Sequence, residues 1–220
     1  MTTRLSLYND ALLLVGERSL SALTDASEPR RLLDQVWNSN GVDACLEAGQ
    51  WEFAMRTVEI DYDTTVTPSY GYTRAFSKPT DWIVTSAVCS DESFTVPVLR
   101  YVDEAGYWYS DLDTMYVRFV SNGSSYGGDL SLWPASFKDY VAAFFASRII
   151  LKITSDQAKL RLFINPENPQ RSIVGRALLN AKNKCAMASP TKMTATGSWS
   201  NARIRGVNRR DGGNTSGNLY

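Results

Sequence analysis

Carboxylates are the side chains of this 220-residue sequence best suited to acid–base chemistry. Asp61 and Asp63 stand two apart in an alternating segment, so they would share one face of a strand. Two carboxylates at a suitable separation could hydrolyse a glycosidic bond. Acidic residues are also common in turns, and no pair stands out by its spacing. The acids in turn-like segments are Asp91, Glu92, Asp103, Glu104, Asp111 and Asp113.

The sequence contains no histidine, which is the most common general base and metal ligand. Ser-His-Asp and Cys-His hydrolases are therefore excluded, and a zinc hydrolase would lack its usual ligands. Cys45, Cys89 and Cys185 are far apart and form no CxxC motif, so buried thiols are expected. The glycine clusters at Tyr126–Asp129 and Gly212–Gly213 lack the Lys-Ser and the helix that follow in a phosphate-binding loop. We expect no catalytic residues, no metal and no cofactor.

The last segment, residues 190–220, combines a basic cluster with an aromatic anchor. It is rich in Gly, Ser, Thr and Asn, and alone it could not bury enough apolar surface to fold. Its arginines could grip nucleic-acid phosphates or pair with an acidic protein groove. Trp and Arg are enriched at interface hot spots, which favours a protein partner. The candidate docking residues are Trp199, Arg203, Arg205, Arg209, Arg210, Leu219 and Tyr220.

Charge is distributed unevenly along the chain although its net charge is zero. Residues 1–137 carry a net charge of −10, and residues 138–220 carry +10. A chain so polarised could pair its own halves, or pair the acidic part of one copy with the basic part of another. We hypothesise that adjacent copies meet in this way. The neutral total argues against a general nucleic-acid binder.

The elements that would position these residues follow from the apolar periodicity. Gly16 is placed to end the first helix, while Ser27 and Ser155 are placed to cap two others. Asn38, Asn40 and Gly41 weaken the middle of the second helix, where a break or kink is expected. The prolines of NPENPQ interrupt the helical pattern before the last helix. Helices are predicted over residues 3–15, 28–48, 135–153, 155–163 and 171–188.

From Thr57 the apolar period becomes two, as in strands with one solvated face. Turn-forming segments separate the strands, and Pro97 marks one of them as an edge or bulged strand. These segments predict an antiparallel β-unit inserted between helices. Strands are predicted over residues 58–62, 72–76, 82–89, 94–102, 107–111 and 114–120.

The predicted fold is α+β: a mainly α-helical bundle of about four to five helices, an inserted antiparallel β-unit and an extended C-terminal arm. In GQWEFAMR, Trp51 and Phe53 would share one face of an extended segment and pin the helices to the β-unit. The expected structural core residues are Trp51, Phe53, Trp82, Phe137 and Phe144. The expected parts are residues 1–56 (helical), 57–133 (β-domain), 134–189 (helical) and 190–220 (partner-docking arm).

A membrane location is not expected, because no apolar run approaches the ~20 residues that span a bilayer. The run ALLLV follows Asp10 and precedes Glu17 and Arg18, with no small-residue cleavage site. This pattern is not that of a signal peptide, and synthesis in the cytoplasm is the simple interpretation.

The order of these parts resembles the tail tubular protein A family, the head-to-tail adaptors of short-tailed bacteriophages. The resemblance covers most of the chain in the right order, and this collinearity makes it specific. The sequence departs from the family pattern at NPENPQ (165–170), so the resemblance does not define the length and packing of the last helices. The matching segments are NDALLLVGE (9–17), LEAGQWEFAMRTVEI (46–60), FSKPTDWIVTSAV (76–88), LRYVDEAGYWYSD (99–111), YVRFVSN (116–122), WPASFKDYVAAFFASRI (133–149) and SWSNAR (198–203).

The resemblance implies a non-enzymatic role at the head–tail junction of a virion. Such adaptors form a ring, usually of twelve subunits, that joins the portal protein to a tail nozzle of the tail tubular protein B kind. DNA passes through the axial channel without sequence-specific binding, and the C-terminal arm reaches toward the portal. Two alternatives stay open: a tail-associated peptidoglycan or polysaccharide hydrolase that uses a carboxylate pair, and a minor DNA-binding protein.

Overall fold

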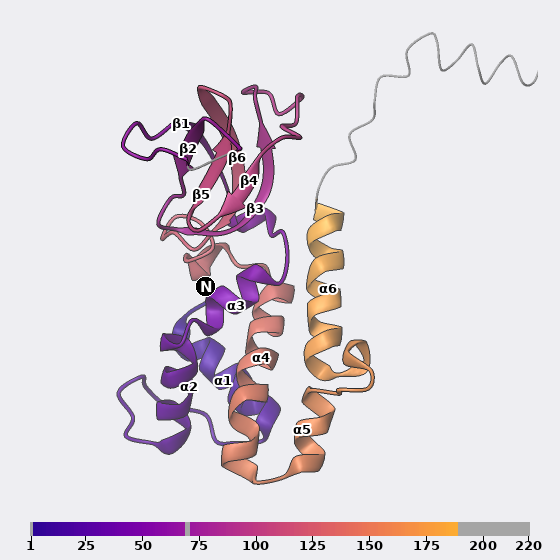
Figure 1. The fold of residues 1–220 in the computed structure, drawn as a ribbon. Helices are drawn as coiled ribbons and strands as arrows, with labels where there is room; N and C mark the ends of the chain where they lie inside the picture. Colours follow the sequence, from indigo (N-terminus) through magenta and orange to yellow (C-terminus); the bar gives the residue numbers. More distant parts are fainter. Residues whose placement is uncertain (1, 69–70, 189–220) are drawn as a thin grey trace, which may run out of the picture. The chain divides into compact units, whose positions relative to one another are not determined.

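The computed structural model describes residues 2–68 and 71–188 (Figure 1). The predicted arm, with its seven candidate docking residues, lies outside the described residues. Within them, six α-helices and two three-stranded antiparallel sheets form a mixed α+β fold. The elements up to Ala186 belong to one compact unit. The predicted boundaries between helical and β parts stay predictions.

Three helices precede the strands: α1 (Arg4–Val15), α2 (Glu28–Asn38) and α3 (Gly41–Glu47). Thr3 caps α1 by accepting a hydrogen bond from the Ser6 backbone N–H, and Gly16 ends it at φ 88°, which glycine adopts without strain. The break expected in the second helix separates α2 from α3, because Asn40 has φ 60° and cannot continue the helix.

Ser27 is at the predicted N-cap position of α2, but its hydroxyl makes no cap hydrogen bond. The hydroxyl oxygen is buried and has no hydrogen-bond partner among the described residues. Pro29 lies in the first turn of α2, where its missing N–H leaves no helical bond unmade. The entry into α2 is therefore fixed by proline rather than by a serine cap.

Six strands lie between α3 and α4, in two antiparallel sheets (Figure 1). Sheet A has the order β1-β6-β3, and sheet B has the order β2-β5-β4. The continuous strand predicted over residues 94–102 is wrong, because Phe94 has φ 56° and Pro97 lacks an N–H. The strands are β1 (Met55–Asp61), β2 (Arg74–Ser77), β3 (Trp82–Cys89), β4 (Val102–Glu104), β5 (Tyr107–Ser110) and β6 (Thr114–Ser121).

Three helices follow the strands: α4 (Ala135–Thr154), α5 (Gln157–Phe163) and α6 (Ile173–Ala188). As predicted, α4 is central: α1, α2, α3 and α5 all pack against it. The cap predicted at Ser155 is displaced by one residue. Ser155 ends α4 at φ 53°, and Asp156 caps α5 by accepting hydrogen bonds from the N–H groups of Ala158 and Lys159. The structure also describes short 3-10 turns between these elements: η1 (Glu52–Ala54), η2 (Leu130–Leu132) and η3 (Pro169–Arg171).

Two hydrophobic clusters fill the fold. The larger one lies among the helices and includes Val120 at the end of β6, so sheet A joins the helical core directly. The smaller one combines Phe76 and Trp108 from sheet B with Met115, Val117, Phe119 and Val88 from sheet A. Because both sheets contribute side chains to it, the two sheets pack face to face.

Candidate functional site

Trp51 lies in an aromatic cluster between the segment that follows α3 and the start of α4. Its side chain is 1% exposed, and its ring centroid is 4.8 Å from that of Phe137 in an edge-on arrangement. The rings of Phe53 and Trp133 also contact Phe137, with centroid separations of 4.8 and 5.0 Å. Edge-on pairs of this kind add to the stabilisation from burial. Trp51, Phe53 and Phe137 therefore lie together, as a structural core would.

The backbone around Trp51 is adapted to its ring. The indole N–H donates to the carbonyls of Cys45 (3.2 Å) and Leu46 (3.0 Å) at the end of α3. A Cβ at Gly49 would be 3.0 Å from the Trp51 ring, so glycine lets the ring lie against the backbone. The extended conformation expected here is wrong. Residues 52–54 form the turn η1, in which the Ala54 N–H donates to the Trp51 carbonyl, and both aromatic rings still reach α4.

Of the five predicted core residues, Trp51 and Phe137 are buried, whereas Phe53, Trp82 and Phe144 are half-buried. Phe144 packs edge-on against Phe145 and lies under the guanidinium of Arg148. Its neighbour Phe145 is fully buried and reaches the rings of Tyr8 and Trp37. Helical spacing alone does not distinguish these two adjacent phenylalanines, since both belong to the wide apolar stripe of this helix.

Trp82 begins β3 and takes part in a polar cluster that sequence reasoning missed. Its ring meets Trp108 edge-on at a centroid separation of 6.4 Å. The Lys78 ammonium lies 3.5 Å from the Trp82 centroid and forms an ion pair with Asp103. Both indole N–H groups donate to the Thr85 hydroxyl at 3.1 Å. The cluster joins sheet A to sheet B, and its parts come from four separate segments.

Replacing Lys78 with alanine is expected to lower the free energy of unfolding by about 2 kcal/mol. The reason is that the Lys78 side chain is only 7% exposed, so its contacts with Trp82 and Asp103 are weakly screened. Urea denaturation followed by tryptophan fluorescence would measure the change. Lys152→Ala, at an exposed lysine, should change stability by less than about 0.5 kcal/mol. Equal effects of the two substitutions would contradict a role for the cluster.

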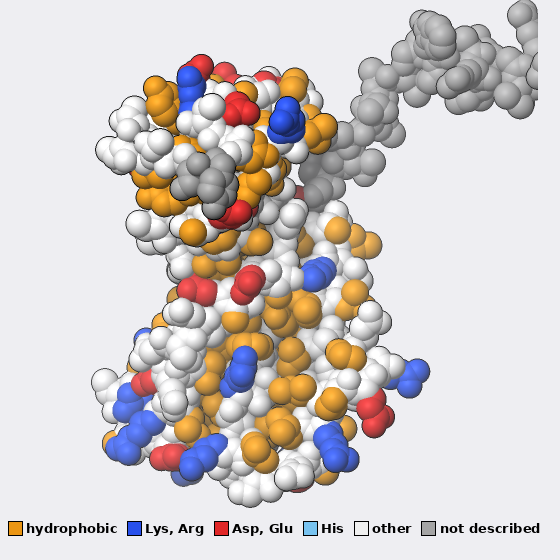
Figure 2. All heavy atoms as spheres, viewed as in Figure 1, with side chains coloured by type: hydrophobic (Ala, Val, Ile, Leu, Met, Phe, Trp, Pro, Cys, Tyr) orange, Lys and Arg blue, Asp and Glu red, His pale blue; other side chains and the backbone are white. Residues whose placement is uncertain are grey.

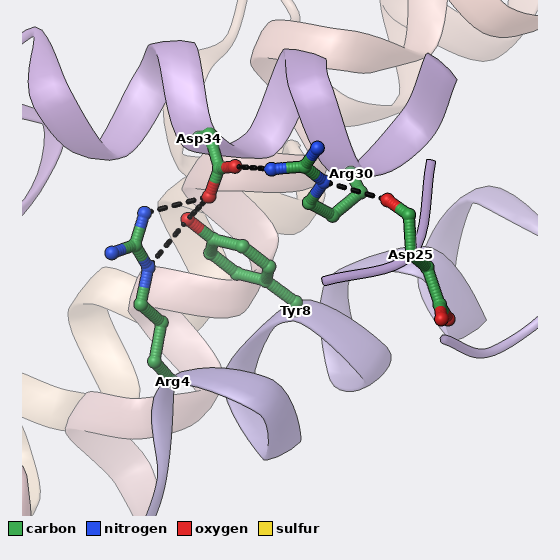
Figure 3. A network of polar contacts seen from close by, with 5 residues as sticks. All are labelled: Arg4, Tyr8, Asp25, Arg30 and Asp34. Atoms are coloured by element: carbon green, nitrogen blue, oxygen red, sulfur yellow. Dashed lines mark hydrogen bonds and ion pairs between the residues drawn. The ribbon is translucent and has the colours of Figure 1, made fainter. Parts of the chain in front are cut away.

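A second polar network ties α1 to α2 (Figure 3). One Asp34 oxygen accepts hydrogen bonds from Arg4 (2.6 Å) and the Tyr8 hydroxyl (2.9 Å), and the other accepts from Arg30 (2.6 Å). Arg4 also donates to the Tyr8 hydroxyl, and Arg30 donates to the backbone carbonyl of Asp25. The Asp25 carboxylate accepts hydrogen bonds from the backbone of the segment before α2. The network thus fixes both helices and their connection.

The ionisation of this network is set by competing effects. Burial raises the pKa of Asp34, but the hydrogen bonds from Tyr8 and Arg30 and the charge of Arg4 outweigh it, and the net shift is downward. Burial raises the pKa of Tyr8 above its ordinary value. Asp34 thus stays charged and Tyr8 stays protonated at neutral pH. Because donors occupy both Asp34 oxygens, this geometry is suited to holding helices together rather than to proton transfer.

The candidate carboxylate pair does not lie as expected. Asp61 is the last residue of β1 and accepts a hydrogen bond from Thr114 on β6 (2.7 Å). Asp63 lies beyond the strand and accepts from Thr65 and Ser77, and the first of these bonds is the main reason that its pKa is lowered. The expectation that both acids share one strand face is therefore wrong.

Of the acids expected in turns, Asp103 and Glu104 lie in β4 instead. Hydrogen bonds from Thr95 lower the pKa of Asp91, and every described carboxylate with a shifted pKa is shifted downward. A glycosidase general acid needs the opposite shift. Asp103 pairs with Lys78, Asp113 with Arg74, and Asp111 accepts hydrogen bonds from Thr73. Glu92 and Glu104 are exposed.

The thiols match the expectation in part. Cys45 and Cys89 are buried, and burial raises the pKa of Cys45 to about 12; Cys185 is half-buried. The part of the chain that the structure describes contains no group of three or more His, Cys, Asp or Glu residues placed to hold a metal ion. Among the described helices, none has the length and apolar character required to cross a membrane.

Comparison with known proteins adds no family to these observations. Neither a scan against models of protein families nor a search of curated proteins found a match for this chain. Evidence on function therefore comes from the order of the elements, the aromatic and polar clusters that join them, and the distribution of charge.

Proposed function

We propose that this protein is a head-to-tail adaptor of a short-tailed bacteriophage. In this proposal it forms a ring, of twelve copies as the resemblance implies, between the portal protein and the tail nozzle. The ring leaves a channel through which DNA passes without sequence-specific contacts. The protein is made in the host cytoplasm and works in the virion as a structural part, with no catalytic residues and no cofactor.

The observation that carries the proposal is the order of elements in the resemblance. That order is helix, helix ending in WEFA, β-insert, aromatic helix and C-terminal helix. In support of it, helices precede and follow the six described strands, although WEFA lies beyond α3, with residues 52–54 in the turn η1. The proposal also includes the finer fold: a helical bundle with an inserted β-unit and an extended arm. It is supported by the central position of α4 and by the aromatic cluster that joins Trp51 to α4.

Particle mass and electron microscopy of the purified protein, with and without portal protein, would test the proposal. Rings, either spontaneous or formed only on the portal, are the expected result. A chain that stays monomeric with portal present, or that releases fragments from peptidoglycan or polysaccharide, would overturn it. The same preparation serves both assays, so the adaptor and hydrolase alternatives are compared directly.

Removing the arm is expected to abolish portal binding without unfolding the rest of the protein. A chain ending at Ser189 retains every described helix and strand but loses Trp199 and the four nearby arginines. Circular dichroism would test folding, and co-sedimentation with portal protein would test binding. Full-length chain with Trp199→Ala and the four Arg→Ala changes is the matched control, and it should lose binding similarly. Undiminished binding by the truncated chain would refute the docking role of the arm.

A further inference from the structure

Helices α4, α5 and α6 and the turn η3 carry a set of cations that we call the basic helical surface. All eight are exposed, and none forms an ion pair with another described residue. On α4, Arg148 and Lys152 lie four residues apart and so share one helical face. The members are Arg148, Lys152, Lys159, Arg161, Arg171, Arg176, Lys182 and Lys184.

The segments that carry this surface have an excess of basic side chains. Residues 138–189 contain nine basic and three acidic side chains, and residues 190–220 contain five basic and one acidic. The salt bridges of the described residues join other cations to acids: Arg4, Arg30, Arg56, Arg74, Lys78 and Lys138. Pairing between the acidic and basic parts of one chain is made by Asp10 and Lys138, whereas the eight cations of the basic helical surface take no part in the salt bridges of the described residues.

The outer side of sheet A carries acidic side chains on β1, and the exposed Arg118 of β6 lies on the same side opposite Thr57. Glu59 and Asp61 alternate with the inward Val58 and Ile60 of β1, so both point away from the β-core. Opposite them on β6, Tyr116 donates a hydrogen bond to Glu59 at 3.0 Å. This hydrogen bond is the largest of the causes that raise the pKa of Tyr116. Burial and the negative charges of Glu59, Glu92 and Asp61 raise it further. We call Glu59, Asp61 and Glu92 the acidic strand face.

Apolar side chains accompany the cations on the helices. Leu162 and Ile164 at the end of α5 are 63% and 47% exposed, and Leu179 on α6 is 47% exposed. Figure 2 shows hydrophobic side chains exposed across the helices on the face drawn, with Lys and Arg side chains between and around them. Exposed apolar area among charged groups is the composition of a contact surface: the apolar part contributes affinity and the charges fix the partner.

We propose that the basic helical surface of one copy binds the acidic strand face of a second copy. This inference deepens the proposed function, since it names the surfaces through which the copies of the ring meet. The two surfaces are different, so a pair of copies still has one basic helical surface free on one copy and one acidic strand face free on the other. Such a head-to-tail contact propagates until it closes into a ring or extends as a filament. The zero net charge of each chain lets many copies join without overall repulsion.

The test reverses each charge set in the full-length chain and then mixes the variants. In the basic variant the basic helical surface is reversed by Arg161→Glu, Arg176→Glu and Lys184→Glu. In the acidic variant the acidic strand face is reversed by Glu59→Lys, Asp61→Lys and Glu92→Lys. We expect each variant alone to associate about 100-fold more weakly than wild type, because like charges would then face each other. A mixture of the two should associate again, since the reversed surfaces complement one another. Sedimentation velocity at low salt measures all three, with circular dichroism as the check on folding.

Matched controls place the same charge changes on exposed residues outside both surfaces. They should associate as wild type does, which separates the local contact from net charge. The basic control is Arg18→Glu, Arg31→Glu and Arg100→Glu; the acidic control is Glu17→Lys, Glu47→Lys and Glu167→Lys. Wild-type association should also weaken between 0.05 and 0.5 M salt, because the Debye length is only about 10 Å at 0.1 M.

The outcomes separate this contact from the adaptor proposal. Wild-type assembly that persists in both reversed variants, or variants that do not associate when mixed, would overturn the contact while leaving ring formation intact. Wild type that stays monomeric at high concentration and on the portal would overturn both proposals. The basic helical surface could instead bind nucleic acid, and a short DNA duplex is the probe for that alternative. If the basic variant loses duplex binding but assembles normally, the surface binds nucleic acid and the contact is refuted.

Discussion

Replacing Trp51 with alanine is expected to lower the free energy of unfolding by about 3–5 kcal/mol, the range typical of a buried aromatic residue. The indole ring is 1% exposed and contacts Phe137 at a centroid separation of 4.8 Å. Its N–H also satisfies the last carbonyls of α3. The substitution would remove all three contributions at the point where α3, η1 and α4 meet. Urea denaturation followed by circular dichroism measures the loss, and assembly should fail with folding.

Two further substitutions separate the parts of this effect. Trp51→Phe keeps most of the buried ring but removes the N–H donor, and should cost about 1–2 kcal/mol. Phe144→Ala changes a half-buried aromatic residue on the same helix that receives Trp51, and should also cost about 1–2 kcal/mol. If Trp51→Ala were as stable as wild type but lost a binding partner, Trp51 would be a recognition residue rather than part of the core.

The sequence predicted elements whose signals are local. Gly16 ends α1 as expected, and α4 matches its long apolar segment closely. The failures occur where two local signals compete. Ser155 and Asp156 are adjacent and both are capping residues, and the aspartate takes the cap. The apolar residues around Pro97 suggest a strand, but the proline and the left-handed Phe94 prevent a continuous ladder.

The contacts of the site were harder to predict, because they join segments that are distant in sequence. Arg4 and Tyr8 are four apart on α1, so their contact follows from helical spacing. Their shared partner Asp34 is on α2, and nothing local indicates it. The Lys78 cluster likewise requires β3, β4 and β5 to come together, which depends on how sheet A packs on sheet B. Trp51 was predicted as a core residue because a Trp and a Phe two apart, at the change from helical to strand periodicity, could pack the helices against the β-unit.

Replacing Asp34 with asparagine is expected to lower the free energy of unfolding at neutral pH by about 2–3 kcal/mol. Asparagine cannot offer two charged oxygens to Arg4, Arg30 and Tyr8, and the Asp34 side chain is only 23% exposed. The matched control is Asp10→Asn, which breaks the Asp10–Lys138 ion pair of α1 and α4. Asp10 is 42% exposed, so water screens that pair, and the loss should be about 0–1 kcal/mol.

The effect of Asp34→Asn should depend on pH in one direction. The folded pKa of Asp34 is below its ordinary value, so the unfolded chain binds this proton more tightly than the folded protein does. The contribution is therefore fully present above the unfolded pKa of about 3.9 and is lost as the pH falls through the folded pKa. Urea denaturation at pH values from 7 down to 3 should show wild type and Asp34→Asn converging below about pH 4. If the difference were the same at every pH, the loss would come from altered packing, and the charged network of α1 and α2 would not be what stabilises their contact.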